Sequence, residues 1–135
     1  KINTGYRIRD GDIYFTCVYP TNDTSVTDSN EGSEVLLVEA YGKSFLFTGD
    51  LGESGEELLL ERGLAGDIDV LKVGHHGSNY SSTETFLSAL QPEYAIISVG
   101  KNNRYHHPGK DALKRLNACG SRIRRYASPV VMPME

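Results

Sequence analysis

The chain has 135 residues, a formal net charge of −4 at pH 7 and 24% charged residues, which suits one globular domain with a packed core. No apolar run approaches the roughly 18 residues that a membrane helix needs, and Lys1–Thr4 open no signal peptide. Because the sequence starts at Lys1, we expect it to be a piece of a longer protein.

The first part of the sequence predicts two β-hairpins. Tyr6–Arg9 and Ile13–Tyr19 are rich in β-branched and aromatic residues and flank a glycine-containing turn. Residues 20–33 are polar and rich in Asp, Asn, Ser and Thr, which predicts an exposed loop. The second predicted hairpin pairs Ser33–Ala40 with Ser44–Phe47.

The pattern then changes to that of a helix. Ser54–Gly63 has Ser54 as the expected N-cap, Glu57 three residues later as its capping-box partner, and Gly63 as the closing residue.

Strands and helices alternate from there to the end. The predicted elements are a strand at Asp69–Val73, a helix from the capping box Ser81–Glu84 through Leu90, a strand at Tyr94–Val99, a helix at Gly109–Ala118 with Pro108 at its first position, and short closing strands at Ile123 and Val130–Met132. Hairpins followed by strand–helix alternation predict a mixed α/β sheet with helices on one face.

The sequence contains two cysteines. Cys17 and Cys119 fit no metal or redox motif, so we expect two buried thiols, with a disulfide as the alternative.

The charges are unevenly distributed along the chain. Residues 1–100 hold six Lys/Arg against sixteen Asp/Glu, whereas residues 101–125 hold eight Lys/Arg against one Asp. This asymmetry indicates either an anionic partner or a solvated helix face beside a charge-protected edge strand.

Candidate metal ligands follow two of the predicted strands. Asp50 comes after the strand that ends near Phe47, and His75 and His76 come after the strand at Asp69–Val73. Carboxylate and imidazole are the ligands of Zn, Mn or Fe. Neighbours on an extended segment point to opposite sides, so one histidine is the expected ligand. We favour His76, because the following glycine frees the chain to wrap an ion.

Both features also have a simpler interpretation. Asp50 could serve only as a turn or cap residue, and the histidines could be ordinary polar residues with hydrogen-bond partners.

A third group of polar residues lies at 102–108, directly after another predicted strand. Arg104 could clamp a phosphate and a histidine there could protonate a leaving oxygen. The alternative is a polar loop in which His107 caps the next helix. Ser78 is not expected to be a nucleophile, because the sequence has no G-x-S-x-G motif.

Together these motifs resemble the metallo-β-lactamase superfamily, and more narrowly the C-terminal domain of ComEC-type DNA-uptake (competence) proteins. The motifs are Asn30-x-x-Ser33, Thr48-Gly49-Asp50, residues 69–78 with their His-His-Gly-Ser sequence, and residues 97–108 with Asn-Arg-Tyr-x-His-Pro. His106 departs from the glycine expected before His-Pro.

The resemblance implies an αββα sandwich that uses water activated at two divalent metal ions, Zn or Mn, for hydrolysis. Asp50 would bridge the two ions, and His76, or less favourably His75, would be the last ligand of the second ion. The scissile group would lie near His107 and Arg104, with Ser78 and Asn103 as substrate contacts.

One family motif is absent from the sequence. H-x-[HD]-x-D-H does not occur, and the four histidines are at 75, 76, 106 and 107 only. We therefore expect residues 1–135 to be one partial domain, the C-terminal half of the sandwich, and to be inactive or nearly so alone. A homodimer could cover the sheet face that the other half would bury.

The leading functional hypothesis is a fragment of a hydrolase that acts on phosphodiesters or DNA in competence-type DNA uptake. The alternatives are a lactonase-like or phosphocholine-esterase-like hydrolase and a non-catalytic assembly or interaction module. The expected location is outside the cytoplasm, either through a membrane-attached parent protein or by secretion.

Overall fold

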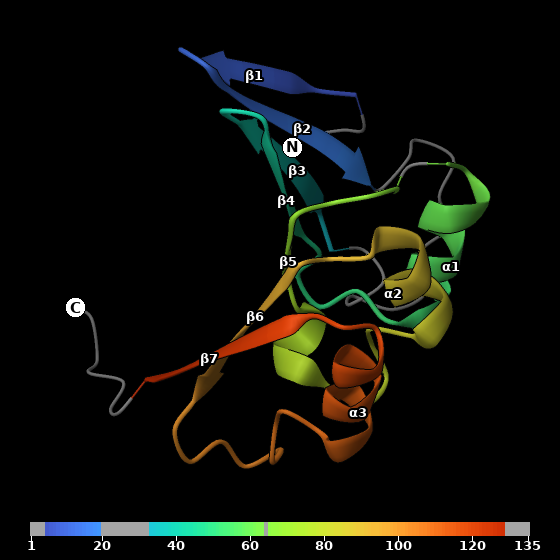
Figure 1. Ribbon diagram of the computed structural model, residues 1–135, viewed down its shortest axis with the longest axis vertical. Coiled ribbons are helices and arrows are strands. Elements are labelled where there is room, and N and C mark those ends of the chain that lie inside the picture. The colour runs from blue at the N-terminus through green and yellow to red at the C-terminus, as the bar shows by residue number, and fades with distance from the viewer. Residues whose placement is uncertain (1–4, 20–32, 64, 129–135) are drawn as a thin grey trace.

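The computed structural model describes residues 5–19, 33–63 and 65–128, which build one seven-stranded sheet and three α-helices (Figure 1). The strands lie in the sheet in the order in which they occur in the chain. They are β1 (Arg7–Asp10), β2 (Ile13–Tyr19), β3 (Val35–Ala40), β4 (Lys43–Phe47), β5 (Val70–Lys72), β6 (Tyr94–Gly100) and β7 (Arg122–Ser128). The helices are α1 (Glu53–Glu61), α2 (Glu84–Leu90) and α3 (Lys110–Ala118), with a short 3₁₀ turn η1 (Gly74–Gly77).

Strands β1 to β4 form an antiparallel meander, which confirms both predicted hairpins. The second hairpin turns on Tyr41 and Gly42, whose φ angles are +51° and +78°. Two successive residues with positive φ match the twist of the flanking strands. The loop predicted over residues 20–33 lies almost entirely outside the described residues.

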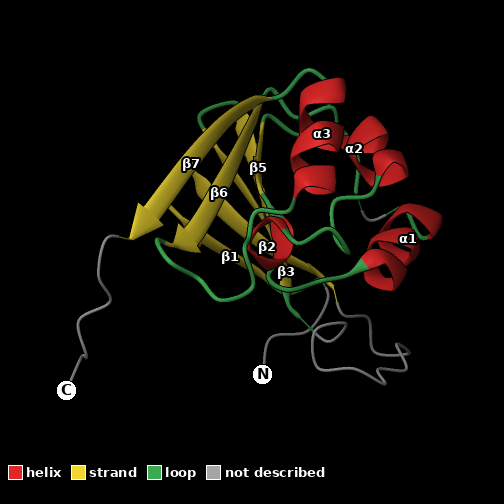
Figure 2. Cartoon of the chain, turned by 90° about the horizontal axis from the view of Figure 1, so that it is seen from below, coloured by secondary structure: helices red, strands yellow, loops and turns green. Residues whose placement is uncertain are grey.

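Strands β4 to β7 are parallel, and α1, α2 and α3 make the connections between them. All three helices pack on the same face of the sheet (Figure 2). This confirms a mixed α/β sheet with helices on one face. Because the strands are parallel, the loops that follow β4, β5 and β6 meet at one edge of the sheet.

The predicted starts of α1 and α3 are wrong by one or two residues. The N-cap of α1 is Gly52, without a side-chain hydrogen bond, so Ser54 lies inside the first turn and forms no capping box. The N-cap of α3 is Gly109, so Pro108 lies one position before the cap. In each case a glycine adopts the extended cap conformation one or two residues from the expected cap.

The other predicted elements agree with the structure within a residue or two. Thr83 caps α2 by accepting a hydrogen bond from the main-chain N–H of Phe86. The predicted capping box Ser81–Glu84 is wrong, because Glu84 is the first residue of the helix and the Thr83 N–H donates to Glu56 on α1 instead. The closing strand at Ile123 is part of β7, whereas Val130–Met132 lie outside the described residues. Cys17 is buried and Cys119 half-buried, and both are free thiols.

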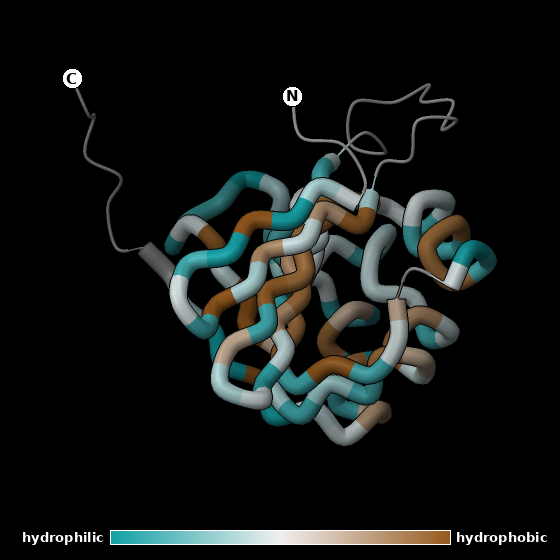
Figure 3. Tube along the Cα trace, turned by 90° about the horizontal axis from the view of Figure 1, so that it is seen from above, coloured by the Kyte–Doolittle hydropathy of each residue, from teal (hydrophilic) through white to brown (hydrophobic). Residues whose placement is uncertain are grey.

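The hydrophobic core fills the space between the sheet and the helices. Leu46, Leu71, Ala95 and Ile97 on the central strands are buried against apolar helix residues; these include Leu59, Phe86, Leu87, Leu90 and Leu116. Hydrophobic segments run along the strands in Figure 3. Such burial contributes roughly 1.5–3 kcal/mol per large side chain and fixes the helices to one face.

The opposite face of the sheet has an apolar patch that none of the described helices covers. Phe15, Leu36, Val38, Phe45 and Phe47 line a shallow groove of about 390 Å³ on β2, β3 and β4. We call this set the open apolar face. Phe15 and Phe47 are exposed, which is unusual for phenylalanines grouped on a sheet. No helix among the described residues is long and apolar enough to span a membrane.

Candidate active site

Three loops at the carboxyl ends of β4, β5 and β6 are tied together by main-chain hydrogen bonds. The N–H of His75 donates to the carbonyl of Gly49 (2.8 Å), which joins the loop after β5 to the loop after β4. The N–H of Gly109 donates to the carbonyl of Gly77 (2.8 Å), which joins the segment after β6 to the same turn. The candidate residues predicted on separate strands are therefore brought to one edge.

His75 and His76 lie in a turn with unusual backbone geometry. Their φ angles are +49° and +54°, in the left-handed region that non-glycine residues rarely occupy. The expectation that they sit on an extended segment and point to opposite sides is therefore wrong. Each residue in this conformation destabilises the folded state by about 1–2 kcal/mol. The surrounding contacts must therefore hold this turn in place. Backbone strain of this kind is often found at functional sites.

The imidazole of His76 is held by strand β6. Its Nδ1 lies 2.6 Å from the main-chain carbonyl of Ser98. A carbonyl oxygen can only accept, so Nδ1 carries the proton and donates. In the neutral ring Nε2 then has a free lone pair, which is the arrangement of metal-binding histidines.

His107 lies against the rings of its neighbours. Its ring centroid is 5.6 Å from that of His75, edge to face, and 5.8 Å from that of Tyr105, stacked. Burial lowers the pKa of His107, and electrostatic repulsion from the neighbouring imidazoles of His75 and His76 lowers it further. His76, Asn103, Tyr105 and His107 line a pocket of about 230 Å³ together with Val99 and Gly100.

Asp50 follows β4 at the same edge of the sheet. Its main-chain N–H donates to the hydroxyl of Ser33 (3.1 Å), so the serine of the predicted Asn30-x-x-Ser33 motif supports this turn. Burial lowers the pKa of Lys72 on β5, and the neighbouring Asp50 carboxylate partly opposes this. Lys72 was not among the candidates, although a single cation in an otherwise apolar strand was a visible signal.

Asn103 and Ser78 are used to shape their loops. The Asn103 amide donates to the carbonyls of Gly100 (3.2 Å) and His107 (2.9 Å) and accepts from the His107 N–H (2.7 Å). Ser78 is buried, and its hydroxyl accepts from the N–H of Tyr80 (3.2 Å). The alternative of His107 as the cap of α3 is wrong, because the N-cap of that helix is Gly109.

The cap of α3 comes instead from Asn79, in the loop that follows the two histidines. Its Oδ1 accepts from the N–H groups of Asp111 and Ala112, both at 3.1 Å. The guanidinium of Arg115 donates back to the carbonyls of Asn79 and Ser81, both at 2.9 Å. Nothing in the local sequence marks this long-range cap, which anchors the histidine loop to α3.

Arg104 is exposed on the loop after β6. Its Cζ lies 5.3 Å from the ring centroid of Tyr105, whose side chain is 67% exposed. A guanidinium held over an exposed aromatic ring at the rim of the pocket is free to meet an anion.

Comparison with known proteins decides the family. The sequence profile of the Metallo-beta-lactamase superfamily matches residues 24–101, more than half of the chain. The chain belongs to the metallo-beta-lactamase superfamily. This match spans Asp50 and the two histidines at 75 and 76, and it ends just before Arg104.

Three curated relatives are similar to this metallo-beta-lactamase chain. ComE operon protein 3 of Bacillus subtilis (strain 168) is 40% identical over 125 residues, which cover 93% of this chain and 16% of that protein. Competence protein ComA of Neisseria gonorrhoeae is 45% identical over 100 residues, covering 73% and 14%. Recombination protein 2 of Haemophilus influenzae (strain ATCC 51907 / DSM 11121 / KW20 / Rd) is 39% identical over 115 residues, covering 85% and 14%.

These relatives confirm the resemblance to the ComEC-type branch that the motifs predicted. The chain spans only 14–16% of their length. A crystal structure of a protein of unknown function from Enterococcus faecalis V583 has a TM-score of 0.40 and 15% identity, covering 98% of this chain and 38% of that one. That similarity is too low to support an argument.

The metallo-beta-lactamase fold implies divalent metal ions, so a complete domain should contain a full set of metal ligands. Within residues 5–19, 33–63 and 65–128, no group of three or more His, Cys, Asp or Glu side chains could hold a metal ion. Asp50 and His76 are suitable donors, but structural and catalytic metal sites need at least three protein ligands. The described residues therefore do not make a complete metal site.

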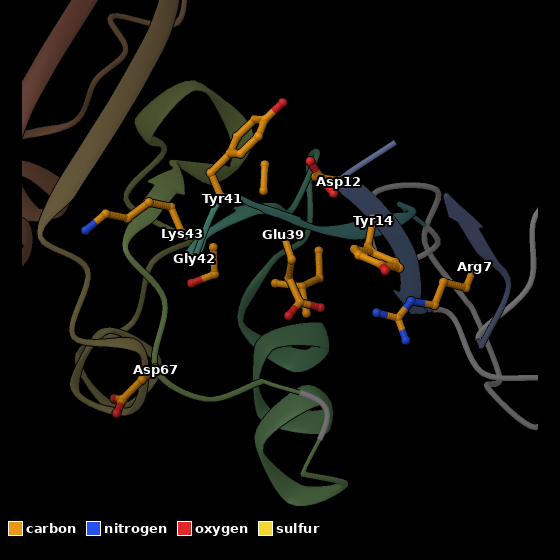
Figure 4. Close-up of a pocket in the computed structure, with 11 residues that line it drawn as sticks. Arg7, Asp12, Tyr14, Glu39, Tyr41, Gly42, Lys43 and Asp67 are labelled. Atoms are coloured by element: carbon orange, nitrogen blue, oxygen red, sulfur yellow. The ribbon is translucent and has the colours of Figure 1, made fainter. Parts of the chain in front are cut away.

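A second hollow lies at the other end of the sheet from the histidines. It has a volume of about 670 Å³ and is lined by residues of β1 to β4 and by Asp67. Figure 4 shows Arg7, Tyr14 and Glu39 along its wall, with the Cζ of Arg7 4.4 Å from the ring centroid of Tyr14. Its walls carry cations and carboxylates in mixture and no histidine, so it has no part in the candidate active site.

Proposed function

We propose that this chain forms the C-terminal half of a metal-dependent hydrolase domain that cleaves phosphodiesters, DNA among them, during competence-type DNA uptake. The observation that carries the proposal is the His76 ring, fixed through Nδ1 to Ser98 so that Nε2 remains available as a ligand. Asp50 at the end of the neighbouring strand is the matching carboxylate. The metals we expect are Zn or Mn, two in the complete domain.

The chain's own residues bind and orient in this proposal. His76, with His75 as the alternative, and Asp50 contribute one imidazole and one carboxylate to the metal centre. Arg104 at the rim of the pocket binds the phosphate group, since a guanidinium can donate two parallel hydrogen bonds to two of its oxygens. His107 lies near the scissile group, and Asn103 and Ser78 hold the substrate side of the loops in shape.

The remaining ligands come from outside these 135 residues. The sequence lacks H-x-[HD]-x-D-H, and two ligands leave an ion mostly hydrated and weakly held. The open apolar face supports the same view, because a second protein layer would bury its phenylalanines. Residues 1–135 are then one partial domain, and in this proposal its parent protein lies at the membrane or cell surface and acts outside the cytoplasm.

The test compares this chain with a longer protein that includes the missing motif. Metal content and cleavage of bis(p-nitrophenyl) phosphate and DNA are measured for both. We expect substoichiometric metal and no turnover from the chain alone, and turnover from the longer protein that is lost in Asp50→Ala and His76→Ala. A tight stoichiometric site with turnover in the chain alone would contradict the half-site, and an inactive, fully metallated longer protein would contradict the hydrolase.

The same open apolar face favours a second candidate, a non-catalytic assembly module in which Asp50 and His76 have no catalytic role. The two candidates differ in one outcome. In an assembly module Asp50→Ala leaves the function of the longer protein unchanged, whereas in the hydrolase it abolishes turnover.

A further inference from the structure

We propose that Arg122, Arg124 and Tyr126 on β7 form a track that binds single-stranded DNA and leads it to the candidate active site. We call these three residues the β7 track. The identity of the ligand rests on the function proposed above. The position of the track rests on strand register, exposure and ring contacts.

The three side chains share one face of the sheet. Alternate residues of a strand point to the same side, and β7 pairs with β6 so that Arg122, Arg124 and Tyr126 lie opposite Tyr94, Ile96 and Ser98. The intervening β6 residues Ala95 and Ile97 are buried beneath the helices. The track therefore lies on the helix-free face, at the edge of the sheet, and all three of its side chains are exposed.

The two arginines are oriented by an aromatic ring. The Cζ atoms of Arg122 and Arg124 lie 5.8 Å and 5.6 Å from the ring centroid of Tyr94. Arg122 also donates to the Tyr94 hydroxyl at 3.3 Å. Guanidinium groups held against a ring lose less conformational entropy when they bind a phosphate than free side chains do.

The track ends beside the residue that holds His76. Tyr126 is paired with Ser98, and the Ser98 carbonyl accepts the hydrogen bond from His76 Nδ1. Because β6 and β7 are parallel, the direction from Arg122 to Tyr126 runs toward the carboxyl edge where the histidines lie. A strand bound along β7 would therefore be delivered to the site.

The chemistry of the track fits a single strand. Its side chains repeat about every 6.6 Å along β7, which is two residues of a parallel strand, and this allows an extended backbone to meet successive cations. Tyr126 is 62% exposed and offers a free ring on which a base can stack. Cations in line with exposed aromatic rings are how proteins bind single strands without reading sequence. The track consists of strand residues only, so it contains no helix that could enter a groove of double-stranded DNA.

The charge distribution also points to this edge. Residues 101–125 carry eight Lys/Arg against one Asp, although the chain as a whole has a net charge of −4. A polyanion approaching the molecule is thus directed to the loop after β6, α3 and β7 rather than to residues 1–100, which hold sixteen Asp/Glu against six Lys/Arg.

Protection of an edge strand against aggregation is the competing explanation for arginines on β7. The other edge of the sheet provides a matched control, since Arg7 and Arg9 on β1 are also exposed and also lie over a tyrosine, Tyr14. If the arginines only protect edges, the two pairs should behave alike toward DNA.

The experiment measures binding of a fluorescently labelled oligo(dT) of about 20 nucleotides to the 135-residue chain by anisotropy, over a range of salt concentrations. The variants are Arg122→Gln with Arg124→Gln, Arg7→Gln with Arg9→Gln, Tyr126→Ala and Tyr126→Phe. Melting temperatures confirm that each variant folds, and a duplex of the same length is the second ligand.

We expect the β7 double variant to bind about tenfold more weakly and to reduce the slope of log affinity against log salt by about 1.4 for the two lost charges. The β1 double variant should stay within about twofold of wild type. Tyr126→Ala should weaken binding about fivefold or more, and Tyr126→Phe should retain it because the ring still stacks.

Equal losses in the two double variants, tighter binding of the duplex, or no binding of oligo(dT) by wild type would each overturn the track. The proposed hydrolase has a separate readout, because bis(p-nitrophenyl) phosphate has no strand to follow. The rate at which the longer protein cleaves this substrate should not change in the β7 double variant. The DNA-binding measurement can therefore contradict the track without contradicting the hydrolase, and the cleavage measurement can contradict the hydrolase without contradicting the track.

Discussion

The ring of His76 and the main-chain carbonyl of Ser98 are joined by a 2.6 Å hydrogen bond between the turn after β5 and the strand β6. This bond selects the tautomer of the imidazole and fixes its direction. It also explains how a residue at φ +54° can be kept in place, since β6 is a central strand paired on both sides. The geometry thus favours His76 over His75 as a metal ligand.

The first prediction concerns metal affinity in the longer protein that includes the missing motif. We expect His76→Ala to weaken Zn or Mn binding by more than the 10–100-fold that is typical of residues supporting a ligand. His75→Ala should have the smaller effect, since the His75 ring only contacts His107 edge to face. Isothermal titration gives the affinities.

His106→Asn is the matched control for that measurement. His106 is exposed and has a positive φ of +54°, which asparagine tolerates. Its substitution should leave metal affinity unchanged. A loss on His75→Ala larger than that on His76→Ala would reverse the assignment.

The sheet could be predicted from the sequence because its signals are local. Runs of apolar, aromatic and β-branched residues mark β2 and β3, a Gly-containing pair marks the turn at Tyr41–Gly42, and a polar Ser-Ser-Thr segment marks the start of α2. The cap of α3 could not be predicted, because its acceptor, Asn79, lies about thirty residues earlier in the chain. Local patterns do not contain such long-range partners.

The sequence predicted which polar residues gather after β4, β5 and β6, but it did not predict the geometry of their loops. Asp50, His76 and His107 stand at strand ends, which is visible in the sequence. The left-handed turn at His75 and His76 is not, because neither residue favours it and only tertiary contacts to Gly49 and Ser98 enforce it.

The second prediction concerns the close approach of Gly77 to Pro108. Gly77 has φ +82°, and a Cβ there would lie 2.6 Å from the Cβ of Pro108 and 3.1 Å from its Cα. We expect Gly77→Ala to lower the free energy of unfolding by about 3 kcal/mol, combining the left-handed penalty with overpacking. Urea unfolding measures this value.

Gly66→Ala is the control for that substitution. Gly66 has no positive φ, and apart from its two chain neighbours no atom of the described residues lies within 4 Å of the position that a Cβ would occupy, so alanine should be neutral or slightly stabilising there. Equal effects of the two substitutions would show that the two loops do not approach as closely as described.

The third prediction concerns self-association through the open apolar face. The isolated chain should form a homodimer in a concentration-dependent manner, because exposed phenylalanines on β2 and β4 favour burial. Phe15→Ser with Phe47→Ser should shift the chain to monomer in sedimentation velocity. Tyr80→Ser, at a residue that is exposed but lies outside the face, should not. A wild-type chain that stays monomeric at high concentration would contradict the prediction.

The fourth prediction concerns Glu56, a buried carboxylate on α1 that joins α1 to α2. Its side chain is 1% exposed and accepts hydrogen bonds from the N–H groups of Ser82 (2.6 Å) and Thr83 (2.9 Å). Burial raises the pKa of Glu56 from 4.5 to about 7, although these hydrogen bonds and the charge of Arg115 act in the opposite direction.

The sign of the pH effect follows from proton binding. Between pH 4.5 and about 7 the folded protein keeps a proton on Glu56 that the unfolded chain has lost, so stability falls as the pH rises. The contribution is complete below pH 4.5 and is lost as the pH passes the folded pKa. Its size is at most about 3 kcal/mol, since each pKa unit corresponds to about 1.4 kcal/mol.

Glu56→Gln removes this titration, and Glu57→Gln, at the exposed neighbouring position, is the control. Glutamine cannot ionise but places an amide where the Ser82 and Thr83 N–H groups need an acceptor, so this variant should be less stable than wild type at all pH values. The informative quantity is therefore the difference in unfolding free energy between wild type and Glu56→Gln at each pH. It should shrink from pH 4.5 to pH 7, while the difference for Glu57→Gln should show no such decrease. Parallel pH profiles for wild type and Glu56→Gln would mean that Glu56 titrates normally and that the contact between α1 and α2 holds an ionised carboxylate throughout.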